Sequence, residues 1–164
     1  MFSEIVIITK KRIPILLLFF VMMPRLSAQD REPLIGTWRL SFPESTFASG
    51  PPSYSRVTCK IDPWEDGLKV TYDMVGKRGG VTHWEWMGTL DGKDYTLQGI
   101  EEVVTNAYRQ VGDRAYEVIA KVDGRIITTT GIVISSDGKV MTVTSNVANA
   151  QGQKVVNTAV YKKR

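Results

Sequence analysis

The chain has 164 residues, 43% of them hydrophobic and 23% charged, and it is long enough for one domain that folds without a metal or a disulfide. It carries 21 Lys and Arg against 17 Asp and Glu, for a net charge of +4, and its single cysteine, Cys59, rules out a disulfide within the chain. The first 28 residues hold four basic side chains and one acidic side chain. Without them, 17 basic and 16 acidic side chains remain, and the net charge is +1. Because these charges are interspersed, we expect no nucleic-acid partner.

The first 28 residues have the three-part pattern of an export signal. A basic cluster at residues 10–12 precedes an apolar run at residues 13–23, and small residues then allow cleavage after Ala28. The apolar run is too short for a helix across about 30 Å of hydrocarbon. We therefore expect a signal peptide at residues 1–28, one domain at residues 29–164, and a periplasmic or extracellular protein with no stable membrane insertion after cleavage.

The mature chain shows strands from its beginning. In residues 36–42, Trp38, Leu40 and Phe42 alternate with polar side chains, which is the pattern of a strand with one buried face. Residues 43–54 contain three prolines and little periodicity, so we expect a loop with at most one helical turn. Further strands are expected at residues 56–62, 68–75, 81–90, 95–98, 103–111, 114–122, 125–135, 139–147 and 154–162.

Short glycine turns separate the strands of the second half, and Asp-Gly pairs among them are strong hairpin signals because glycine accepts a positive φ. Ten short strands joined by hairpins bury one face most economically by closing on themselves, which also removes exposed edges. We predict an all-β fold, an antiparallel up-and-down barrel of about 8–10 strands with no long helix in the mature chain. A two-sheet sandwich is the alternative, less favoured because long crossovers are missing. The turns are Asp91-Gly92, Gly112-Asp113, Asp123-Gly124, Asp137-Gly138 and Gln151-Gly152.

Alternation also predicts which side chains face the barrel interior. Tyr72 shares a face with Leu68, Val70 and Met74, and Tyr116 shares one with Val118, Ala120 and Val122. In the strand around residue 84, Trp84 and Trp86 oppose the only histidine, His83. Because large aromatic side chains favour burial, we expect the two tryptophans inside and His83 outside.

The motif Gly36-Thr37-Trp38-Arg39-Leu40 resembles the Gly-x-Trp signature that opens the first strand of lipocalin-like (calycin superfamily) proteins. The resemblance implies that Gly36 and Trp38 form the plug of the closed end, beneath a cation from Lys162, Lys163 or Arg164. The chain lacks the disulfides of lipocalins and the helical lid of the fatty-acid-binding branch, so no ligand identity is carried over. Similarity to exported bacterial lipocalin-like proteins of uncharacterised function continues through residues 45–47, 83–86, 91–95, 136–144, 149–153 and 160–161.

The chain shows no motif typical of catalysis, metal binding or cofactor binding. There is no Gly-x-Ser-x-Gly elbow and no Cys and His spacing for a metal, and haem ligation by His83 would require the opposite strand register. Glu101 and Glu102 are neighbours next to a turn, so we expect them in solvent. Cys59 shares a face with Val57 and Ile61, which predicts a buried, unreactive thiol.

These observations predict an exported, non-enzymatic barrel that binds a small, partly hydrophobic or aromatic molecule, with Tyr72, Trp84, Trp86 and Tyr116 on the wall of the site. One alternative is a barrel enzyme of the isomerase or cyclase type that uses inward polar groups such as Glu85 or Tyr108. Another is an envelope interaction module with a solid core. An empty interior favours binding, and a filled interior favours the interaction module. The sequence predicts neither the ligand nor the oligomeric state.

Overall fold

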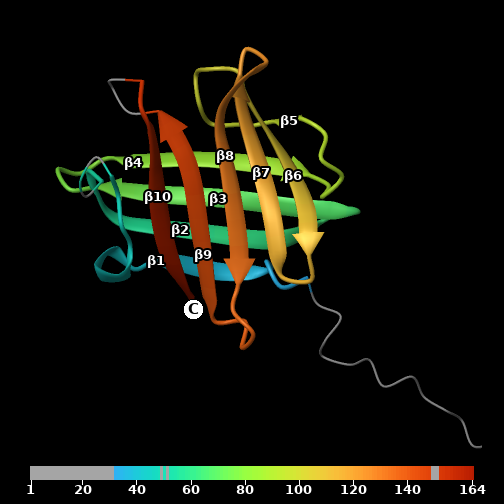
Figure 1. Cartoon of the computed structure of the whole chain (residues 1–164), viewed down its shortest axis with the longest axis horizontal. Coiled ribbons are helices and arrows are strands. Elements are labelled where there is room, and N and C mark those ends of the chain that lie inside the picture. The colour runs from blue at the N-terminus through green and yellow to red at the C-terminus, as the bar shows by residue number, and fades with distance from the viewer. Residues whose placement is uncertain (1–31, 49, 51, 149–151) are drawn as a thin grey trace, which may run out of the picture. The chain divides into compact units, whose positions relative to one another are not determined.

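The computed structural model describes residues 32–48, 50, 52–148 and 152–164, and the signal peptide expected at residues 1–28 lies outside these ranges. The described chain forms ten antiparallel strands and one short 3-10 helix, which confirms the predicted all-β, up-and-down barrel (Figure 1). No helix of the described part is long and apolar enough to cross a membrane. The elements are β1 (Gly36–Leu40), η1 (Phe42–Glu44), β2 (Tyr54–Trp64), β3 (Gly67–Gly76), β4 (Val81–Gly88), β5 (Tyr95–Thr96), β6 (Val104–Gly112), β7 (Ala115–Val122), β8 (Arg125–Ile134), β9 (Val140–Ala148) and β10 (Lys154–Lys163).

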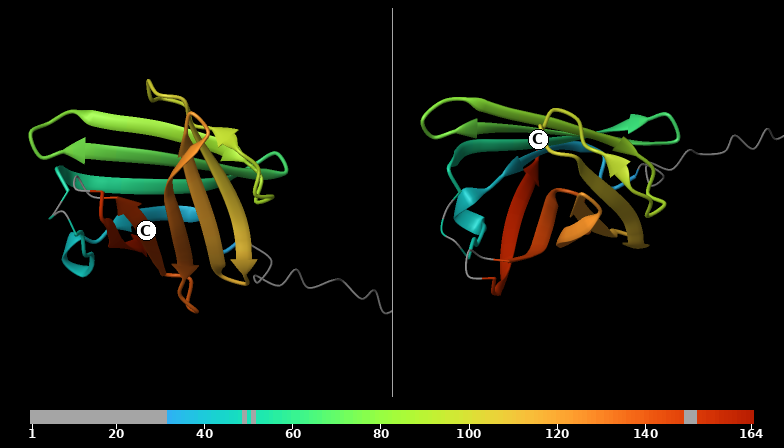
Figure 2. Two further views of the ribbon diagram at one scale, coloured as in Figure 1. Left: turned by 45° about the horizontal axis from the view of Figure 1, so that its top comes forward. Right: turned by 90° about the horizontal axis from the view of Figure 1, so that it is seen from above.

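The strands form one sheet in the order β4-β3-β2-β1-β10-β9-β8-β7-β6-β5. Neighbours in this sheet are neighbours in sequence except at one place, where β1 pairs with β10 and Trp38 lies opposite Lys163. The sheet curves so that β2, β3 and β4 cross behind β6 to β10, and the view from above shows the two groups of strands facing each other (Figure 2). Their inward side chains therefore meet in one interior.

The barrel closes incompletely between β4 and the segment that follows β5. Glu85 and Gln98 form an isolated antiparallel bridge, in which each N–H donates to the other residue's carbonyl at 2.9 and 2.8 Å. The strand expected at residues 95–98 is shorter in the structure, because Gln98 pairs with β4 instead of continuing the β5 ladder. Gly99 has a φ of +89°, and a Cβ built on it would lie 2.7 Å from the carbonyl oxygen of His83, so this close approach requires glycine.

The connection between β1 and β2 is tied to β10. After η1, Thr46 and Thr158 exchange two backbone hydrogen bonds of 2.8 Å, and the N–H of Ala48 donates to Oδ1 of Asn157 at 2.9 Å. The single turn expected in this loop is present, but the sequence pattern did not predict its pairing with a strand more than one hundred residues away.

One end of the barrel is filled by side chains around Trp38. Trp38 and Leu34 are 0% exposed, and the indole N–H of Trp38 donates to the carbonyl of Leu34 at 2.8 Å. Nζ of Lys163 lies 4.8 Å from the centre of the Trp38 ring, which is the cation contact that the lipocalin resemblance implies. Truncating a buried tryptophan to alanine typically costs about 3–5 kcal/mol, so this end contributes strongly to the stability of the barrel.

Candidate ligand-binding cavity

The barrel interior contains a cavity of about 420 Å³. This volume lies within the usual range for small-molecule sites, about 300–1,000 Å³. The cavity is lined by side chains from both facing groups of strands and from the β1–β2 connection, where Phe47 and Pro52 contribute. The interior is therefore not packed solid, in contrast to the end filled by Trp38.

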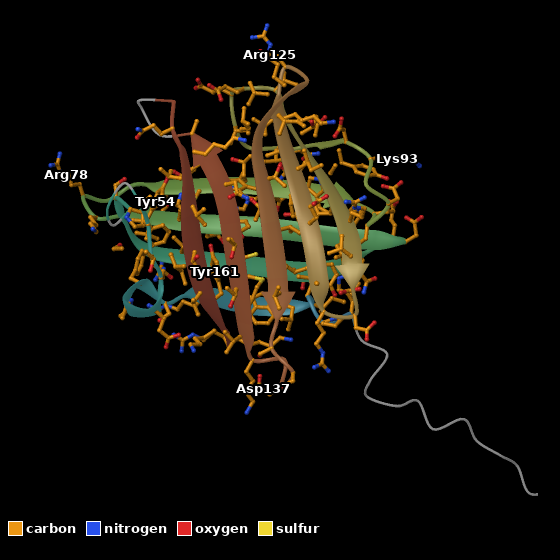
Figure 3. The ribbon with its side chains drawn as sticks, in the orientation of Figure 1. Tyr54, Arg78, Lys93, Arg125, Asp137 and Tyr161 are labelled. Atoms are coloured by element: carbon orange, nitrogen blue, oxygen red, sulfur yellow. The ribbon has the colours of Figure 1, made fainter. Side chains whose placement is uncertain are left out.

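One wall of the cavity is aromatic. Register between β3 and β4 places Tyr72 opposite Trp84, and their rings stack at 4.4 Å with an interplanar angle of 21°. Tyr161 meets Tyr72 edge to face at 6.5 Å. In Figure 3, Tyr161 lies near the middle of the barrel and Tyr54 nearer the side of Arg78. These rings offer a flat, apolar surface on which an aromatic or hydrophobic ligand can pack.

The polar groups of the lining are uncharged, and none of the described residues around the cavity is Asp, Glu, His, Lys or Arg. Thr130 and Ser145 share a hydrogen bond of 3.0 Å between their hydroxyl groups, and Asn157 is bonded to the loop through Ala48. Because an unpaired charge is costly to bury, such a lining suits a neutral ligand. Besides the tyrosines, the polar lining residues are Asn106, Thr128, Thr130, Ser145 and Asn157.

The deeper tyrosines remain protonated phenols. Burial is the largest cause that raises the pKa values of Tyr72, Tyr108 and Tyr161 above the usual 10, because the charged phenolate would lose its hydration. Burial also raises the pKa of the Cys59 thiol to about 12, against a hydrogen bond with Tyr72 that lowers it. The cavity therefore presents neutral O–H groups at physiological pH.

The structure brings two of the four predicted wall residues to the cavity. Tyr72 and Trp84 line it, whereas Trp86 and Tyr116 are buried outside its lining. Trp86 donates from its indole N–H to the carbonyl of Asn106 at 3.0 Å and packs against the ring of Tyr108 at 4.2 Å. The hydroxyl of Tyr116 is bonded to the carboxylate of Glu32. Both side chains belong to the packed core.

His83 and Glu85 lie on the outer face of β4. His83 is half-exposed, as expected from the alternation, and its Nδ1 lies 2.8 Å from Oδ1 of Asp73. The enzyme alternative included Glu85 among the inward polar groups, and this was wrong. Its Oε1 lies 2.8 Å from Nζ of Lys69 on the outer surface, because residues on either side of Trp84 and Trp86 point away from the interior.

Sequence reasoning missed several lining residues. Asn106 and Tyr161 were not named, although alternation along β6 and β10 assigns both to the inner face together with Tyr108 and Ala159. That signal was available in the sequence. Phe47 could not have been found in this way, because it reaches the cavity from a connection without periodicity.

Comparison with known proteins gives no family. No family model matches the chain, and no curated protein matches it either. Over residues 32–48, 50, 52–148 and 152–164, no group of three or more His, Cys, Asp and Glu side chains is arranged to hold a metal ion. The nearly closed barrel of ten antiparallel strands is consistent with a lipocalin-like fold.

Proposed function

We propose that this protein is an exported lipocalin-like barrel that binds a small, neutral, partly hydrophobic or aromatic molecule in its interior. The observation that carries the proposal is the cavity of about 420 Å³, with an aromatic wall and only uncharged polar groups. The ligand packs on the stacked pair Tyr72 and Trp84, across from apolar side chains of β7, β8 and β9 that include Val118, Ile132 and Val143. Membership of the calycin superfamily and export through residues 1–28 are parts of the same proposal.

The size of the cavity allows a useful affinity. Each 100 Å² of apolar surface removed from water contributes about 2.5 kcal/mol, and association costs at least about 4 kcal/mol. A ligand that buries roughly 500 Å², counting its own surface and that of the wall, would reach about −8 kcal/mol, which corresponds to a micromolar Kd. A molecule with two fused or linked aromatic rings has the surface to do so.

The test is a titration with N-phenyl-1-naphthylamine, a neutral probe whose fluorescence increases in apolar surroundings. We expect saturable binding by the protein. Ala159→Phe introduces a ring into the cavity from β10 and should weaken binding at least tenfold. Val156→Phe is the matched control, because Val156 lies on the same strand, is 53% exposed and does not line the cavity. It should bind the probe as the unmodified protein does.

The outcome against the proposal is equally clear. If the probe does not bind, or if Ala159→Phe and Val156→Phe bind it equally well, then the interior is not the binding site. A solid-core interaction module is less well supported, because the interior holds a cavity large enough for a small molecule.

A further inference from the structure

Asn106 is the one buried polar residue among the described residues whose side chain lacks full hydrogen bonding. It is 7% exposed, it lines the cavity, and its Oδ1 has no hydrogen-bond partner in the described part of the chain. Leaving a buried polar atom unpaired costs about 1–3 kcal/mol, so native structures rarely keep one without a role.

The surroundings of Asn106 fix its position but give that oxygen no hydrogen-bond donor. Its backbone is held in the ladders of β5 and β7, opposite Tyr95 and Ala120, and its carbonyl accepts the indole N–H of Trp86. Its side chain is also hydrogen-bonded to Tyr108, the next inward residue of β6. Oδ1 is covered in this structure, and the soft χ2 torsion of asparagine lets the amide turn toward the cavity without moving the strand.

The other asparagine of the lining has a different role. Oδ1 of Asn157 accepts the N–H of Ala48 and so fastens the β1–β2 connection to β10. Two residues of the same type thus face the same cavity, one with its acceptor occupied and one with its acceptor free.

We infer that Asn106 is the polar anchor of the cavity, and that the preferred ligands are neutral apolar or aromatic molecules carrying one hydroxyl or N–H group that donates to its Oδ1. This inference rests on the proposed binding function and narrows it to a ligand class. The donor lies beside Asn106 and Tyr108, while the apolar body of the ligand packs on Tyr72 and Trp84.

The test compares 2-naphthol with its methyl ether, 2-methoxynaphthalene, by isothermal titration calorimetry. The two probes share the same ring system, but only the naphthol can donate a hydrogen bond. A cavity without an anchor would favour the more apolar ether. We expect the unmodified protein to bind 2-naphthol about tenfold more tightly, the effect of one buried hydrogen bond.

Two variants assign this preference to a residue. Asn106→Leu should abolish or reverse the preference for 2-naphthol, whereas Asn146→Leu, at an exposed asparagine of β9 outside the cavity lining, should retain it. The unfolding temperature of ligand-free Asn106→Leu should stay close to that of the unmodified protein, because removing the unpaired oxygen offsets the lost interaction with Tyr108 and the side-chain volume is kept. Lost selectivity would then not result from misfolding.

Each failure has a distinct meaning. Suppose that N-phenyl-1-naphthylamine binds, but the unmodified protein does not prefer 2-naphthol or Asn106→Leu keeps that preference. The anchor role of Asn106 is then wrong, and the proposed binding function stands. Failure of both naphthalenes to bind while N-phenyl-1-naphthylamine binds also overturns the anchor. If no probe binds, the proposed function fails and the anchor fails with it.

Discussion

Cys59 is shielded both by its burial and by its protonation. It is 1% exposed, and burial raises the pKa of its thiol to about 12, so almost no thiolate exists at neutral pH. We expect no modification by N-ethylmaleimide under native conditions and complete modification after unfolding in guanidinium chloride, measured by mass spectrometry. As the only cysteine of the chain, it gives an unambiguous signal. Rapid labelling of the native protein would contradict the inward position of this side chain.

His83 lies in a chain of charged side chains on the outer face of β3 and β4. Its ring contacts Asp73 and Glu85, and Glu85 also pairs with Lys69. The hydrogen bond from His83 to Asp73 is the largest cause that raises the pKa of His83 above its usual 6.5. A titration by NMR should show this elevated pKa, and Asp73→Asn should lower it.

The raised pKa also determines the sign of the pH dependence. The stabilisation by protonated His83 is fully present below the unfolded-state pKa of about 6.5 and is lost as pH rises through the higher folded-state pKa. Because His83 is half-exposed, solvent screens the interaction and the loss is small. His83→Gln should remove this part of the pH dependence of the unfolding temperature. An unchanged pH profile in that variant would assign the dependence to other groups.

At the level of single residues, the sequence predicted which face a side chain takes but not how deep it lies. Trp84 and Trp86 both point inward, as alternation requires, yet Trp84 lines the cavity and Trp86 is packed in the core. The two tryptophans are neighbours on the inward face of β4, two residues apart in sequence. Strand periodicity does not tell whether an inward side chain meets the cavity or the packed core. That outcome depends on where β5 to β7 end and on which side chains they place opposite β4.

The bridge between β4 and the segment after β5 is the weakest lateral contact of the sheet, since a single residue pair replaces a ladder. Gly99→Ala should disrupt it, because the added Cβ would meet the carbonyl of His83 and the positive φ would be strained. Gly138→Ala is the control. Gly138 has a φ of +69° but no atom within 4 Å of a Cβ, so it carries the conformational penalty alone, about 1–2 kcal/mol.

We therefore expect Gly99→Ala to lower the free energy of unfolding by more than Gly138→Ala, measured by urea denaturation. Amide hydrogen exchange at Glu85 and Gln98 should accelerate only in Gly99→Ala, because these two N–H groups form the bridge. Equal effects of the two substitutions would mean that the close approach to His83 does not matter for stability.

At the level of elements, most hairpins were predictable and long-range pairings were not. The hairpin expected at Asp91-Gly92 was wrong, because β4 and β5 lie at opposite ends of the strand order and this turn pairs with β6. Asp123 and Gly124 have φ values of 48° and 74°, the two positive values that a type I′ turn requires, and Val122 pairs directly with Arg125. This turn is fixed by two adjacent residues. The pairing of Thr46 with Thr158, by contrast, joins residues that meet only after β10 has docked.

In the described domain as a whole, the barrel has a packed end and a hollow interior. Buried side chains around Trp38 fill one end of the barrel. The cavity lies in the part of the interior that Tyr72 and Trp84 line. Barrel closure was predictable from the number of strands and their hairpin links. The cavity itself was not predictable. Strands with the same alternation of inward and outward residues can enclose a filled or a hollow interior, depending on the sizes of the side chains that face each other.

The pairing of β1 with β10 has a consequence for how the chain folds. β1 can find its second neighbour only after the last ten-residue strand has been synthesised, because the contact joins residues near position 38 to residues near position 163. A pairing between residues so far apart in sequence forms slowly, because the entropy of closing a long loop opposes it, and interior side chains stay uncovered until the final strand docks. A nascent chain that lacks β10 therefore cannot complete the barrel, and its uncovered apolar side chains are open to aggregation and to chaperone binding until that strand is made.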